Sequence, residues 1–142
     1  MGAVRPEVWL LSRLEAEFLT LASTLHPMLV EFDRLSTESC RFYEIARQAH
    51  RCRDPQIFDL DAHVEANKRI KTASEWQAYN AAREPTDELD DRLNALVSSF
   101  MDTPMVTLPA LLLKFRIGKS LRQHDNGALG DLSRLAAEAL CT

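Results

Sequence analysis

The sequence has 142 residues, of which 46% are hydrophobic and 27% are charged, and its formal net charge is −4. This length fits one domain, and the composition excludes a disordered chain. The negative charge gives no overall electrostatic reason to bind nucleic acid or an acidic membrane surface.

One long helix is predicted over about residues 7–52. Its apolar residues follow alternating steps of three and four, which places them on one stripe of a helix. The stripe is a candidate packing or dimer seam made of Leu11, Leu14, Phe18, Leu21, Leu25, Met28, Phe32, Leu35 and Phe42. Pro27 lies inside this pattern. Because the spacing continues across it, we expect one helix kinked near Pro27, the alternative being two helices joined there.

A second helix is predicted from about residue 61, after a linker over residues 55–60. Asp59 or Asp61 can cap it. Pro85 interrupts its pattern, and the acidic residues that follow are typical of a helix start. We therefore expect a fresh N-terminus at Thr86.

The next helix is predicted from Thr107, which can cap it, to about His124, with Pro109 in its first turn. Its Gly-Lys-Ser at 118–120 matches the end of a phosphate-binding loop. That motif needs a glycine where Leu113 stands and a flexible loop around it, so a phosphate site is not expected. A final short helix is predicted over about 129–140.

Four basic residues spread over about half of the circumference of the helix that begins at Thr107: Lys114, Arg116, Lys119 and Arg122. Apolar residues occupy the other half, so the helix is expected to enter the core with a basic outer face. A solvated face is the simplest interpretation. The alternative is a contact with an acidic protein partner or with nucleic acid.

These elements predict an all-α fold in a single domain over residues 1–142. We expect a long, kinked antiparallel helical hairpin or bundle with two shorter C-terminal helices. A long hairpin can leave part of its seam uncovered, and a homodimer would then cover it.

The patterns of metal and catalytic sites are missing from the sequence. It contains no Cys-x-x-Cys, His-x-x-x-His or Glu-x-x-His, which argues against structural zinc and di-iron sites. Cys40 and His50 would lie about 15 Å apart along one helix, too far for a nucleophile–base pair within it. We predict no catalytic residue, no metal site and no cofactor.

The three cysteines, Cys40, Cys52 and Cys141, form no disulfide pattern, which favours a reducing compartment. The N-terminal apolar stretch is interrupted by Glu7 and Arg13, and no run of about 18 apolar residues occurs. We therefore expect a cytoplasmic protein with no signal peptide and no membrane partner.

Residues 78–117 resemble a recurrent pattern in small uncharacterised alphaproteobacterial proteins, many of them prophage-associated. The matching residues are Thr107, Leu108, Leu111, Lys114 and Arg116. Ala110 stands where those proteins usually have glycine, which puts a close backbone approach there in doubt. The resemblance implies a cytoplasmic helical protein and no particular reaction.

The first functional hypothesis is a non-enzymatic helical protein–protein interaction module that acts through the seam and forms a homodimer. The second is a regulator from a mobile element that contacts nucleic acid, or a nucleic-acid enzyme, through the basic helix. The third is a small ligand carrier or enzyme with a pocket between its helices.

Overall fold

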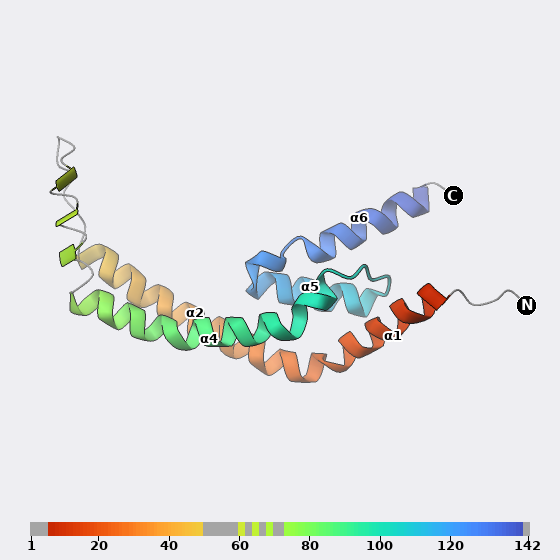
Figure 1. The fold of residues 1–142 in the computed structure, drawn as a ribbon, viewed down its shortest axis with the longest axis horizontal. Helices are drawn as coiled ribbons and strands as arrows, with labels where there is room; N and C mark the ends of the chain where they lie inside the picture. The colour runs from red at the N-terminus through yellow and green to blue at the C-terminus, as the bar shows by residue number, and fades with distance from the viewer. Residues whose placement is uncertain (1–5, 50–59, 62–63, 66–67, 70–72, 141–142) are drawn as a thin grey trace, which may run out of the picture. The chain divides into compact units, whose positions relative to one another are not determined.

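The structure is a computed structural model, and it describes residues 6–49, 60–61, 64–65, 68–69 and 73–140. It is all-α, as predicted, with no strand in those ranges. Its elements are α1 (Pro6–Thr20), α2 (Ala22–Ala49), α4 (Ser74–Met101), α5 (Leu108–Ser120), the 3₁₀ turn η1 (Arg122–His124) and α6 (Gly127–Leu140) (Figure 1). The described residues 60–61, 64–65 and 68–69 are helical too, in the region of the predicted second helix.

The chain divides into two compact units, each described here by itself. Unit 1 consists of residues 1–31 and 90–142, and unit 2 of residues 32–89. The helices α2 and α4 each contribute residues to both units. The single domain over 1–142 stays a prediction.

The predicted long N-terminal helix is divided at Leu21, one and a half turns before Pro27. The Leu21 N–H donates to the Phe18 carbonyl at 3.1 Å, a three-residue spacing that tightens the end of α1. Pro27 lies inside α2, five residues after Ala22. The proline therefore lies past the first turn of α2, and the chain divides at Leu21 instead.

Pro85 lies inside α4, which continues from Ser74 to Met101. The expected fresh N-terminus at Thr86 is therefore wrong. Thr86 is buried, and its hydroxyl donates to the Ala82 carbonyl one turn earlier. A proline in a helix interior costs about 3 kcal/mol. Burial of apolar side chains along the same helix, Leu89 and Leu93 among them, offsets that cost.

Unit 1 holds most of the hydrophobic core. The rings of Phe18 on α1 and Phe100 on α4 stack with their centroids 5.3 Å apart. The amide of Gln123 and the ring of His124 in η1 both reach the Asn94 side chain on α4, at 2.9 and 2.8 Å. The buried apolar residues of this unit are Phe18, Leu25, Leu29, Leu93, Val97, Met101, Met105, Ala110, Leu111, Ile117, Leu121 and Ala128.

Unit 2 contains the second half of α2 beside the first half of α4 (Figure 1). Tyr43 meets Trp76 and Tyr79 edge to face, with ring centroids 5.8 and 5.4 Å apart. These three aromatic residues pack against each other. Only Ala46 and Leu89 are buried apolar residues among the described part of this unit.

Candidate interaction surfaces

The segment between α4 and α5 is held by a buried lysine. Lys114 on α5 is 1% exposed, and its Nζ donates to the carbonyls of Thr103 and Met101 at 2.7 and 3.3 Å. It also pairs with the Asp131 carboxylate on α6 at 2.6 Å. The same carboxylate accepts the Met105 N–H at 3.2 Å. One ion pair therefore fixes α5, α6 and the connecting segment together.

A second buried charge holds the start of α5. The Glu15 carboxylate on α1 accepts the Val106 N–H at 2.7 Å and the Thr107 N–H at 3.2 Å. It also accepts the Thr107 hydroxyl at 2.7 Å. Thr107 is the N-cap residue as predicted, but its own side chain makes no capping bond. A carboxylate from another helix supplies the acceptor and lies at the favourable end of the α5 dipole.

The end of α5 lies close to the turn that follows it. A Cβ added at Gly118 would lie 2.9 Å from the His124 carbonyl oxygen and 3.0 Å from the Asp125 Cα. Glycine is therefore required here for close backbone packing, and the Gly-Lys-Ser segment has a structural explanation. The helix ends at Ser120, earlier than predicted, and η1 takes up residues 122–124.

The inward side of α6 carries the polar residues Asp131 and Arg134 beside the buried Ala128 and the half-buried Leu135. Asp131 is buried, and Arg134 is half-buried with its Nη2 donating to the Met105 carbonyl at 2.9 Å. Its apolar stripe faces solvent at the spacing i, i+3, i+7 and i+11. Leu129 is 56% exposed and Leu140 is 87% exposed. We call this surface the α6 stripe; it consists of Leu129, Leu132, Ala136 and Leu140.

The helix α5 also presents large apolar side chains to solvent. Leu108, Leu112 and Phe115 are all exposed and follow each other at i, i+4 and i+7. Lys119 continues the same row at i+11 and is exposed too. We call this surface the α5 stripe. The opposite side of α5 carries its buried residues, which are Ala110, Leu111, Lys114, Ile117 and Gly118.

The four predicted basic residues do not share one surface, so the expected basic outer face needs a correction. Lys114 is buried in its ion pair with Asp131 and cannot meet a partner. Arg116 is half-buried and donates to the Ser120 hydroxyl. Lys119 and Arg122 are exposed. Only Lys119 and Arg122, two of the four, are therefore fully at the surface.

The predicted dimer seam is used largely within the chain. Phe18 and Leu25 have no exposed surface, and they pack in the core of unit 1. They are therefore not available to a second copy, which corrects their assignment to a dimer contact. Leu11 lies outside the described side chains. The remaining seam residues are half-buried: Leu14, Leu21, Met28, Phe32, Leu35 and Phe42.

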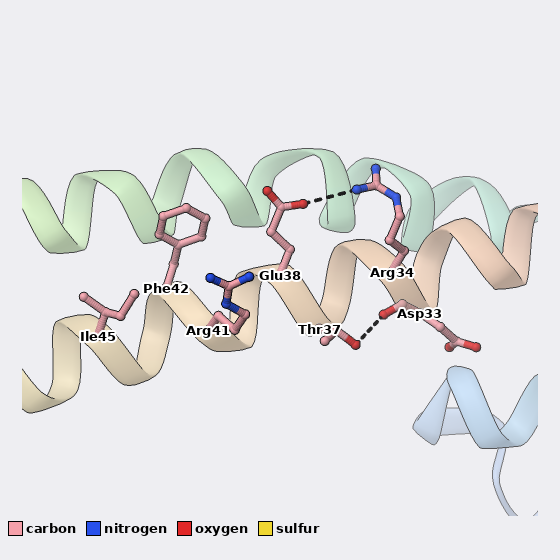
Figure 2. Close-up of a pocket in the computed structure, with 7 residues that line it drawn as sticks. All are labelled: Asp33, Arg34, Thr37, Glu38, Arg41, Phe42 and Ile45. Atoms are coloured by element: carbon pink, nitrogen blue, oxygen red, sulfur yellow. Dashed lines mark hydrogen bonds and ion pairs between the residues drawn. The ribbon is translucent and has the colours of Figure 1, made fainter.

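The outer side of α2 in unit 2 carries a shallow groove of about 620 Å³ (Figure 2). Its seven described lining residues all lie on α2: Asp33, Arg34, Thr37, Glu38, Arg41, Phe42 and Ile45. Figure 2 shows Arg34 paired with Glu38, at 3.3 Å, and the Thr37 hydroxyl bonded to the Asp33 carbonyl. Since one helix supplies every described wall, the groove does not enclose a small molecule as a typical ligand site does.

The described residues contain no group of three or more His, Cys, Asp or Glu side chains that could hold a metal ion. Cys40 is an exposed free cysteine. His50, Cys52, His63 and Cys141 lie outside the described residues. Within the described helices, none combines the length and the apolarity that a bilayer-spanning segment needs.

The sequence contains a signal for the buried lysine that the prediction did not use. On a helix with about 100° per residue, Lys114 lies between Ile117 and Gly118 and next to Leu121. These neighbours are all buried. Asp131, one of two acidic residues in the leucine-rich final helix, is its partner. No comparable signal marks Glu15, because its partners lie 91 and 92 residues away.

Comparison with protein-family models, with curated proteins and with solved structures finds no match to this chain.

Proposed function

We propose that this chain is a non-enzymatic helical protein–protein interaction module and that the α6 stripe is its contact surface. The supporting observation is the orientation of α6. This helix buries Asp131 and leaves Arg134 half-buried, while Leu129 and Leu140 face solvent. Contiguous exposed apolar side chains on one face are typical of surfaces that bind another protein.

The orientation of α6 is determined by strong contacts. Asp131 is held by Lys114 and by the Met105 N–H, and Arg134 by the Met105 carbonyl. Rotating the helix to bury the leucines of the α6 stripe would leave Lys114 buried without a counter-ion, a loss of about 3–5 kcal/mol. The leucines therefore face outward in the folded chain before any partner binds, which reduces the entropic cost of binding.

A second copy of this chain is the first partner to test. The α6 stripe carries no charged residue, so two stripes can meet without burying an unpaired charge. A dimer through α6 would replace the dimer first expected through the N-terminal seam. Isologous contacts of this kind are the commonest in homo-oligomers.

The test compares the wild-type chain with the double variant Leu129→Ser/Leu132→Ser by sedimentation velocity over a range of concentrations. It also compares the proteins that copurify with each of the two chains after cross-linking in the native cell. We expect self-association or a retained partner with the wild type, and loss of both with the double variant. The matched control is Val30→Ser on α2, whose exposed fraction, 51%, is close to that of Leu129.

The proposal fails if two results are obtained together. The wild type stays monomeric at high concentration, and every protein that copurifies with it also copurifies with the double variant. Circular dichroism of each variant distinguishes loss of binding from loss of fold. The other two hypotheses have less support. Burial of Lys114 leaves fewer cations for phosphate contacts, and every described wall of the groove comes from α2 alone.

A further inference from the structure

The α5 stripe is a second apolar surface, and it ends in positive charge. Leu108, Leu112 and Phe115 form a row along one side of α5, and Lys119 is the next residue in that row. Arg122 follows at the start of η1 and is exposed. Among the described residues, neither Lys119 nor Arg122 has an ion-pair partner.

The surface is rigid, because α5 is fixed at three points along its length. Glu15 holds its N-terminus, Lys114 anchors its middle, and Gly118 packs its last turn against the following backbone. A partner that binds the stripe therefore does not have to order the helix first. Preorganised surfaces of this kind lose less conformational entropy on binding.

The dimensions of the row suit one helix. Leu108 and Lys119 are eleven residues apart, which is about 16 Å along a helix axis. A single narrow row with anchors at i, i+4 and i+7 is the counterpart of an amphipathic helix with the same spacing. Charge determines which partner helix fits. A helix with carboxylates at one end could place them against Lys119 and Arg122, whereas basic residues at that end would be repelled.

We propose that the α5 stripe docks the apolar face of an amphipathic helix from a partner protein, with the acidic end of that helix against Lys119 and Arg122. The inference rests on the proposed function. It adds the α5 stripe as a second contact surface and specifies the chemistry of the partner that binds there. Anionic membranes and nucleic acids fit less well, because the chain has a net charge of −4 and only a few exposed cations at this site.

The test starts with a displayed library of helical peptides, randomised on one face, that is selected against the full chain. We expect enrichment of peptides with large apolar residues at i, i+3 or i+4, and i+7, followed by Asp or Glu. Fluorescence anisotropy of the best labelled peptide then gives its affinity for the wild type and for each variant. Rising salt should weaken the binding, because exposed charges contribute to it.

Two pairs of variants locate the contact. Leu112→Ser should weaken peptide binding by about tenfold or more, as expected for a central apolar anchor, whereas Val30→Ser, with a similar exposed fraction, should not. The double variant Lys119→Glu/Arg122→Glu should weaken it by at least about tenfold. Arg92→Glu, an exposed cation on α4, is the charge control and should change it little.

Several results overturn the inference. These are no enrichment, enrichment without acidic residues, equal binding to the charge-reversed variant, or preferential binding of the chain to anionic vesicles or duplex DNA. Each leaves the test of the α6 stripe intact, because Leu129→Ser/Leu132→Ser does not alter α5. Conversely, a peptide that binds the α5 stripe while the α6 test fails would support a contact on α5 alone.

Discussion

Units 1 and 2 differ in where their charged residues lie: both have exposed ion pairs within single helices, but among the described residues only unit 1 also has buried charged side chains. In unit 1, Glu15 and Lys114 are buried and bind backbone groups of the segment between α4 and α5. In unit 2, the ion pairs Arg34–Glu38 and Arg83–Asp87 are exposed, each within one helix. Buried charges with backbone partners determine how elements are placed, whereas exposed pairs within a helix add little stability. The outward stripes of α5 and α6 depend on the first kind.

The largest effect is expected for Lys114→Met. It leaves the buried Asp131 carboxylate without its counter-ion and two carbonyls without a donor. The free energy of unfolding should fall by about 3–5 kcal/mol, as measured by urea denaturation followed by circular dichroism. The matched control, Lys119→Met, should change it by less than about 0.5 kcal/mol. Equal losses for the two would contradict the distinction between the buried and exposed lysines.

A smaller loss is expected for Glu15→Gln. The variant keeps one amide carbonyl oxygen as an acceptor. It cannot accept hydrogen bonds from the Val106 N–H, the Thr107 N–H and the Thr107 hydroxyl with two oxygens, as the carboxylate does. The free energy of unfolding should fall by about 1–3 kcal/mol. Glu17→Gln, in an exposed pair with Arg13, is the control, with less than about 1 kcal/mol expected. If Glu17→Gln costs as much, the capping role of Glu15 is wrong.

In unit 2, Tyr43→Leu keeps most of the apolar area but removes two edge-to-face contacts. We expect a loss of about 1 kcal/mol in the free energy of unfolding. Trp76 fluorescence in a Trp9→Phe background would report this unit. A double-mutant cycle with Trp76→Leu, followed by circular dichroism, should show coupling of about 0.5–1.5 kcal/mol. Strict additivity of the two changes would exclude an energetic contact between the rings.

The smallest effect is expected for Arg83→Ala. A hydrogen bond to Asp87 raises the pKa of the Arg83 guanidinium, but both side chains are more than half exposed. Solvent screens such a pair, so no measurable change in urea denaturation is expected. A loss as large as that of Tyr43→Leu would show that exposed pairs also contribute to unit 2, and would weaken the contrast between the units.

Local patterns in the sequence predicted the helices well. The seam spacing and the cap at Thr107 both correspond to helical elements. Prolines were less informative: Pro85 lies inside α4 because side-chain burial along a long helix outweighs the local cost of one missing hydrogen bond.

Which helix faces turn inward could not be predicted equally well. Lys114 was expected outside because lysine usually remains in water, yet it lies on the buried side of α5. Likewise, the direction of the α6 leucines was not predicted, and three of the four are exposed. Their orientation depends on Asp131 and Arg134, whose partners lie in another element. Such choices depend on tertiary contacts that periodicity along one helix does not contain.

The Glu15 cap also constrains when this part of the chain can fold during synthesis. Its partners, Val106 and Thr107, lie 91 and 92 residues later in the chain. At about 5–20 residues per second, a ribosome needs roughly 5–20 s to add them after α1. Throughout that interval the Val106 and Thr107 amides have not yet been made, so the Glu15 cap can form only after residue 107 has been added.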